Sequence, residues 1–181
     1  KKALRRASAY HVTVDRAWRQ VVRHTQELTY SSRPGDCWLS DELALLYWLV
    51  GRVPGNQWRR GDVRFHSVEL WHTASGELAA GDIGCICGGI YTSATGFCKK
   101  GRHPGSGTVL LTALGRWLVR SGVHVWDLGQ VLAYKIDLGA VQWSMLEWVE
   151  ALERFRVMPP AALRSPPASE ANAYHLITSK M

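Results

Sequence analysis

The pattern of hydrophobic and polar positions divides this chain into a helical start, a block of strands and a mixed second half. Apolar residues in 11–29 recur at helical spacing, which predicts a helix there. A second helix is predicted after Ser40, a favourable N-cap, and Gly51 suits its end. Turn-rich loops at 31–36 and 52–62 flank this helix. Three strand-like runs then follow, at 63–72, 78–86 and 87–97.

The second half predicts one long helix, one short strand and two further helical pieces. After a loop at 99–108 comes a helix that ends at Gly122. One face of that helix carries Leu110, Leu114, Trp117, Leu118 and Ser121. The remaining segments are a short buried strand at 123–129, a helical piece with a turn at 130–140, an amphipathic helix at 144–155 and a Pro/Ala/Ser-rich strap from 158 to 173.

This order of elements predicts an α+β fold, with a mixed, mostly antiparallel twisted sheet flanked by helices. The chain has 181 residues, of which 46% are hydrophobic, so it is long and apolar enough for one domain with a buried core. We expect that domain to span residues 1–157, followed by a Pro/Ala-rich C-terminal extension over 158–181.

Net charge and cysteine content indicate more about the cellular environment of the protein than about its activity. The net charge of +7 permits a polyanionic partner without requiring one, and the clustered cations fit either a functional basic face or an ordinary surface. No apolar run is long enough to span a membrane, and no apolar signal segment opens the sequence. Cys85 and Cys87 would share one face of a strand, a poor start for a zinc site, so we expect reduced thiols, no metal and a cytoplasmic location.

The loop KKGRHPGSGT at 99–108 is a candidate phosphate site. Glycines allow consecutive backbone N–H groups to converge on an anion, and the following helix adds the positive end of its dipole. The candidate phosphate-binding residues are Lys99, Lys100, Arg102, Gly105 and Gly107. The pattern R-x-x-G-x-G resembles the pyrophosphate loop of the GNAT N-acetyltransferase superfamily, which implies acetyl-CoA as a substrate. A turn that merely caps the helix is the alternative.

A wider resemblance runs from about residue 10 to residue 153. The segments that carry it are YHVTVDRAW, CWL at 37–39, HSVELWHTASGELAAGDIGCICGGIY at 66–91 and VWDLGQ…LGA. They resemble the leucyl/phenylalanyl-tRNA–protein transferases, whose GNAT-like catalytic domain takes its acyl group from an aminoacyl-tRNA 3′ end. The resemblance implies transfer of Leu or Phe to the N-terminal Lys or Arg of an acceptor protein, with no cofactor beyond the donor.

The sequence departs from that family at positions that matter for its chemistry. Ala94 stands where the family has a glutamate, and Gln130 comes one position later than the family's glutamine after Asp127. An N-terminal domain that helps the family grip its substrate has no counterpart in the few residues before the match. Three hypotheses therefore remain open: an aminoacyl-tRNA–protein transferase, an acyl-CoA-dependent N-acyltransferase using the glycine loop, and an inactive relative that binds tRNA or protein.

Asp127 and Gln130 are the candidate catalytic residues. Transfer of an acyl group to an amine requires that the amine lose a proton and that both substrates be oriented. A carboxylate at a strand end, beside an amide, would orient the acceptor amine or relay its proton. The alternative is that Asp127 only caps the element that follows.

The candidate substrate-binding residues are mostly aromatic. By the family resemblance, Trp38, Tyr91, Phe97 and Trp126 lie near the pockets for the adenosine and the apolar side chain, although core packing is the alternative for each. Asp82 takes a position that is apolar in the family pocket. If Asp82 faces the pocket, it would favour a polar or cationic donor, whereas facing water it would have little effect.

Overall fold

A five-stranded sheet organises the computed structural model, which describes residues 2–32, 37–50, 52 and 62–179. Its strands are β1 (Tyr10–Val14), β2 (Val63–His72), β3 (Leu78–Cys87), β4 (Ile90–Cys98) and β5 (Val125–Asp127), side by side in that order. The first four strands pair antiparallel, and β5 pairs parallel to β4. The predicted three-strand meander, the short fifth strand and the α+β class are therefore confirmed.

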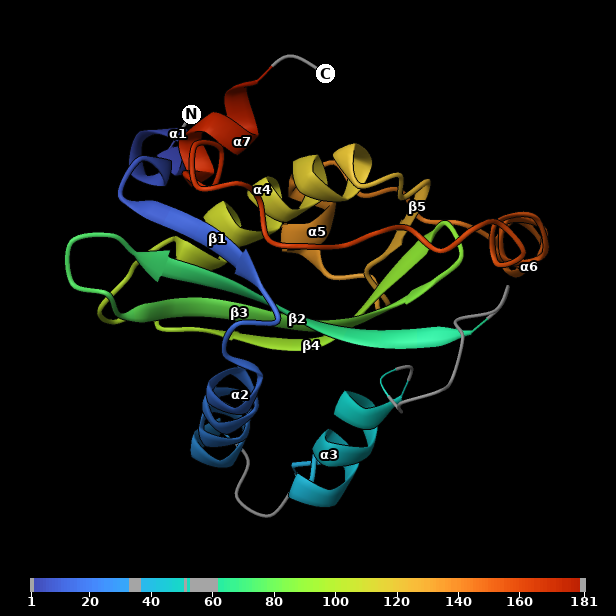
Figure 1. Ribbon diagram of the computed structural model, residues 1–181, viewed down its shortest axis with the longest axis horizontal. Coiled ribbons are helices and arrows are strands. Elements are labelled where there is room, and N and C mark those ends of the chain that lie inside the picture. Colours follow the sequence, from blue (N-terminus) through green and yellow to red (C-terminus); the bar gives the residue numbers. More distant parts are fainter. Residues whose placement is uncertain (1, 33–36, 51, 53–61, 180–181) are drawn as a thin grey trace.

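Helices cover both faces of this sheet. Their bounds are α1 (Lys2–Ala7), α2 (Trp18–Ser32), α3 (Asp41–Leu49), α4 (Ser106–Arg120), α5 (Ala133–Asp137), α6 (Met145–Phe155) and α7 (Ala173–Thr178). In Figure 1, α2 and α3 lie below the sheet, whereas α1, α4, α5 and α7 lie above it. Helix α6 packs its Ala151 and Trp148 against Ile90 and Val125, at the outer end of β4 and β5. None of the helices in the described ranges has the length and apolar character that crossing a bilayer requires.

The predicted helix over 11–29 is wrong in its first part. Residues Tyr10–Val14 form β1, and the helix begins only at Trp18. The β-branched residues of HVTV suit a strand, and pairing with β2 satisfies their backbone groups. Asp15 then ends the strand with a positive φ of 58°, while its carboxylate accepts the backbone N–H of Ser67 and lies 2.8 Å from His66 Nδ1.

The predicted helix boundaries are otherwise confirmed where the structure describes them. Ser40 caps α3 by accepting the N–H of Leu43, and Ser144 forms a capping box with Glu147 at the start of α6. Gly122 follows α4 with a φ of +85°, a conformation that favours glycine. Gly51, the end of the first predicted loop at 33–36 and most of the second at 53–61 lie outside the described residues.

The Pro/Ala-rich segment from residue 158 crosses the sheet as an extended strap and joins the main core. Ala161 and Leu163 are buried in the same cluster as residues of β1, β2 and α4. The N–H of Val12 donates to the carbonyl of Ala171 at 2.8 Å, so the strap covers the outer edge of β1. Helix α7 follows, beside α1 and α4 (Figure 1).

Substitution of Leu114 tests how much the packing of α4 contributes to the stability of the fold. Its side chain is fully buried, so Leu114→Ala should lower the free energy of unfolding by about 2–5 kcal/mol. Val119 on the same helix is 53% exposed, and Val119→Ala should cost less than about 1 kcal/mol. Urea denaturation of both variants measures the difference. Equal losses would contradict the position of α4 over the sheet.

Candidate functional site

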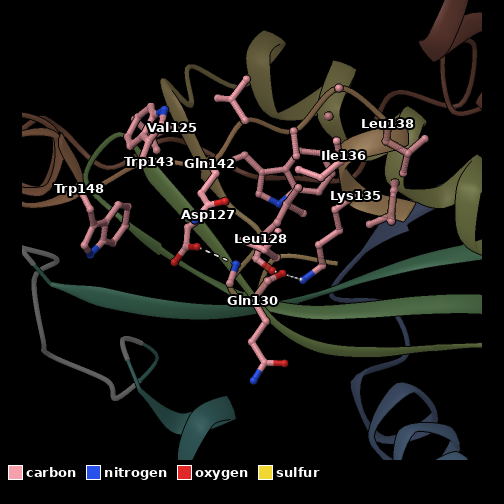
Figure 2. A pocket seen from close by; sticks show the side chains of 18 of the residues that line it. Val125, Asp127, Leu128, Gln130, Lys135, Ile136, Leu138, Gln142, Trp143 and Trp148 are labelled. Atoms are coloured by element: carbon pink, nitrogen blue, oxygen red, sulfur yellow. Dashed lines mark hydrogen bonds between the residues drawn. The ribbon is translucent and has the colours of Figure 1, made fainter. Parts of the chain in front are cut away.

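A cavity of about 740 Å³ lies between α4, the end of β5 and the segment that leads into α6. Figure 2 shows its lining side chains converging around the turn after β5. Residues of α4 form one wall, and residues 124–131, 135–136 and 138–143 form the others together with Trp148. It is larger than a second cavity of about 420 Å³ beside Val14 and Arg64, so we take it as the candidate site.

The cavity lies beside the end of the short strand β5, and no residue of β4 lines it. The two strands pair only from Ile90 and Val125 to Thr92 and Asp127, after which β4 continues alone to Cys98. The chain leaves the sheet after Asp127, whose side chain lines the cavity.

A β-bulge in β4 follows directly after that point. Ser93 pairs with Gly84 and Thr95 pairs with Ile83, so Ala94 is an extra residue opposite a single step of β3. Bulges of this kind often lie beside active sites, where they redirect neighbouring side chains. The position at which a glutamate was expected is thus an exposed alanine on a bulge.

The cavity wall is strongly apolar on two sides. In Figure 2, Trp143 and Trp148 lie on one side of Asp127, and Ile136 and Leu138 lie on the other. Ile136, Leu138 and Trp143 are between 41% and 45% exposed, which is unusual for side chains of this size. The wall therefore suits an apolar group of a ligand.

Asp127 brings a carboxylate to this apolar cavity. Its Oδ1 accepts the N–H of Gly129 at 2.7 Å, as the dashed line in Figure 2 shows. Gly129 has a φ of +68°, so the chain turns sharply here. The alternative that Asp127 caps the following helix is wrong, because Leu132 is the N-cap of α5 and Asp127 instead closes a turn through Gly129. The Asp127 carboxylate lines the cavity.

Gln130 and Asp127 do not meet. In Figure 2 the Gln130 side chain points away from Asp127, although both residues line the cavity. The turn between them is held by Lys135, whose Nζ donates to the carbonyls of Leu128 and, at 2.9 Å, of Gln130. The catalytic roles predicted for Asp127 and Gln130 stay predictions, and the structure does not bring the two side chains together.

Three of the predicted site residues form one hydrogen-bonded chain behind the cavity. Trp126, in the cavity wall, donates its indole N–H to Ser93 Oγ at 3.0 Å. Ser93 donates to Asp82 Oδ2 at 3.1 Å, and the Tyr91 hydroxyl donates to the same oxygen at 2.7 Å. Gly84 makes room for this arrangement, because a Cβ there would lie 2.4 Å from the Tyr91 ring.

Asp82 is the buried anchor of that chain. Burial raises the pKa of Asp82 to about 6, although the hydrogen bonds from Tyr91 and Ser93 favour the ionised form. Asp82 is not among the residues that line the cavity, and neither is the fully buried Tyr91. Both therefore reach a ligand only through Ser93 and Trp126.

The cations of the glycine loop are engaged with a carboxylate of the protein. Glu77 accepts hydrogen bonds from Lys99 and Arg102 at 3.2 Å and lies 3.1 Å from His103 Nε2. The hydrogen bonds from His103, Lys99 and Arg102 lower the pKa of Glu77 to about 2. None of these residues lines the cavity.

The glycine at the start of α4 is also covered. Gly105 has a φ of +84°, and a Cβ there would lie 2.8 Å from Arg6 Nη1. The same Arg6 guanidinium donates to the carbonyl of Pro104. Lys100 is exposed, and Gly107 allows α4 to approach Cys98 of β4 closely. Phosphate binding by this loop stays a prediction.

Two predicted aromatic residues lie away from the cavity. Phe97 packs in the core between the sheet and α2, with the His24 ring 5.0 Å away, on the face opposite α4. Trp38 precedes α3 on that same side and is half exposed. Their role in substrate binding stays a prediction.

Several lining residues were not found from the sequence. Trp143, Trp148 and Arg116 were not singled out, because pattern analysis does not show which helix face meets a cavity. A usable signal was present in 131–149, where many apolar residues fall close together. These include Val131, Leu132, Val141, Met145, Leu146 and Val149, all exposed.

Comparison with known proteins supports one family. A family model described as leucyl/phenylalanyl-tRNA protein transferase matches residues 1–153. The leucyl/phenylalanyl-tRNA–protein transferase of Syntrophotalea carbinolica is 28% identical over 163 residues, covering 87% of this chain and 62% of that protein. Its counterpart in Syntrophobacter fumaroxidans is 26% identical over 147 residues, covering 81% of this chain and 56% of that protein. The chain thus spans about three-fifths of the length of these curated relatives.

Solved structures support the fold. An aminoglycoside acetyltransferase from an uncultured soil metagenomic sample, in complex with sisomicin, superposes with a TM-score of 0.51 at 10% identity. The match covers 77% of this chain and 95% of that one. The expected GNAT-like acyltransferase fold is therefore confirmed.

The titration of Asp82 gives the site a measurable signature. The raised pKa favours a protonated Asp82 carboxyl in the folded protein. Between pH 3.8 and about 6, the folded state therefore holds a proton that the unfolded chain has already released. The contribution of Asp82 to the free energy of unfolding should therefore fall by about 3 kcal/mol as the pH rises through this window.

Asp82→Asn should remove that decline, whereas Asp137→Asn, at an exposed position on α5, should keep it. Urea denaturation at pH values from about 4 to about 7 measures both. A wild-type slope that persists in Asp82→Asn would show that another group titrates.

Proposed function

Because the chain belongs to the leucyl/phenylalanyl-tRNA protein transferase family, we propose that it moves an amino acid from aminoacyl-tRNA to the N-terminus of an acceptor protein. The donor is the aminoacylated 3′ end of a tRNA, and the acceptor is an N-terminal amine. We place the reaction in the cytoplasm, where charged tRNA is available. The amino acid transferred is Leu or Phe, or one of similar character.

The observation that carries this proposal is a cavity with an apolar wall and one carboxylate, Asp127, in its lining. Trp143, Trp148 and Ile136 offer contact to a large apolar side chain, as Leu or Phe would need. Asp127 lies between them, at the end of β5, where an amine could be held. Asp82 is buried and lies outside the cavity lining, so it leaves the apolar character of the wall intact.

The reaction assigns Asp127 a definite task. The acceptor amine attacks the ester carbonyl, a C–N bond forms, the ester C–O bond breaks, and the proton lost by the amine ends on the ribose oxygen. Gly129 holds Asp127 Oδ1, and within the described ranges Oδ2 has no hydrogen-bond partner. Oδ2 is therefore available to accept a hydrogen bond from the amine and orient its lone pair towards the carbonyl.

The acyl-CoA hypothesis has less support. It would need the glycine loop to hold a pyrophosphate, yet Lys99 and Arg102 already pair with Glu77, and Arg6 covers Gly105. The resemblance to an acetyltransferase structure concerns the fold alone. The hypothesis of an inactive binding relative differs in predicting that tRNA or protein binds without turnover.

The decisive experiment measures transfer of labelled Leu or Phe from charged tRNA to a peptide with N-terminal Lys or Arg. We expect turnover by the wild type and a loss of about 100-fold or more in Asp127→Ala, because general acid–base and orienting groups contribute on that scale. Asp137→Ala, an exposed aspartate ten residues further on, is the matched control and should retain activity.

The other outcomes each select a different hypothesis. Turnover that survives in Asp127→Ala would keep the transferase and reject the role of Asp127. Binding of charged tRNA without turnover would identify an inactive relative. Binding of acetyl-CoA that shields residues 99–108 from protease, together with no transfer from tRNA, would support the acyl-CoA enzyme.

A further inference from the structure

We propose that Arg116, in the C-terminal half of α4, binds a backbone phosphate at the 3′ end of the aminoacyl-tRNA, and that the glycine loop at 99–108 does not. This inference rests on the proposed function and adds to it a phosphate contact inside the cavity. The starting point is the hydrogen-bond and ion-pair partners of the Lys and Arg side chains near the cavity.

Arg116 is a cation in the cavity wall without a protein counterion. It lines the cavity and is partly buried, and no hydrogen-bond or ion-pair partner for its guanidinium occurs among the described residues. Lys135, the other Lys or Arg side chain in the described lining, donates to the carbonyls of Leu128 and Gln130. One turn further along α4, Arg120 pairs with Glu170. Arg116 is thus the lining side chain whose charge is left for a ligand.

The surroundings of Arg116 make an anionic ligand favourable. Gly115 beside it allows the Trp126 ring to pack against the helix, since a Cβ there would lie 2.9 Å from that ring. A guanidinium against an aromatic and apolar wall is less well solvated than one in open water, so a hydrogen bond to a charged oxygen is worth more. Guanidinium groups also bind phosphate with two parallel hydrogen bonds.

The glycine loop is poorly suited to the same task. An incoming phosphate would have to compete with the Glu77 carboxylate for Lys99 and Arg102. It would also have to displace the Arg6 side chain from Gly105 and from the Pro104 carbonyl. Arg116 requires neither rearrangement.

The charges of the cavity match an aminoacylated nucleotide. Arg116 on α4 is positive and Asp127 at the end of β5 is negative, and both line the cavity together with the apolar wall. An aminoacyl-adenosine end carries a phosphate, an apolar side chain and an ester carbonyl attacked by an amine. Each of these groups has a counterpart in the cavity, with the phosphate on the α4 side.

The test is the salt dependence of binding to a short single-stranded RNA that ends in CCA. Each phosphate contact to a single strand contributes about −0.7 to the slope of log K against log salt. Arg116→Gln should therefore make the slope shallower by about 0.7 and weaken binding at low salt about fivefold to tenfold. Arg116→Lys should restore most of the slope, because the charge is kept.

Arg102→Gln is the matched control, since Arg102 belongs to the loop and pairs with Glu77. It should leave the slope unchanged. Fluorescence anisotropy measures the binding, and urea denaturation confirms that every variant is folded.

A slope unchanged in Arg116→Gln would overturn the inference, and the proposed function would stand if transfer still depends on Asp127. A slope lowered by Arg102→Gln and not by Arg116→Gln would assign the phosphate to the glycine loop. If the wild type binds coenzyme A and not the RNA, both the inference and the proposed function fail.

Discussion

The parallel pairing of β4 with β5 over only three residues is the constraint on which the site depends. Strand β5 ends at Asp127, where the chain leaves the sheet and the cavity opens. Strand β4 continues alone, with a bulge at Ala94. The chain after β5 turns at Gly129 and returns through α5 and the start of α6 to close the opening.

Buried polar contacts hold the walls of that opening in place. Trp126 in the wall is tied through Ser93 to Asp82, a carboxyl that would be costly to bury without the hydrogen bonds it accepts. Gly84 leaves space for the Tyr91 ring that completes this chain. Before the N-terminus of α4, Glu77 contacts Lys99, Arg102 and His103 of the glycine loop. Contacts within the protein therefore hold this loop in place.

The elements that the sequence predicted correctly are those with local causes. The three-strand meander has clear alternation, α3 and α6 have serine caps, and Gly122 marks the end of α4. The exception is β1, where HVTV fitted both a helical and an alternating pattern. Pairing with β2 decided in favour of the strand, which is a contact between residues more than fifty positions apart.

The sequence by itself determined the family, the fold class and a set of candidate site residues, because motifs and periodicity are properties of neighbouring positions. Only the tertiary structure decided what these residues face. It set Trp126 and Asp127 in the cavity and placed Phe97 in the core between the sheet and α2. It also engaged the loop cations with Glu77 and left Arg116 without a protein partner in the described ranges. Charge pairing depends on distances in space, and a chain's order of residues does not contain those distances until it folds.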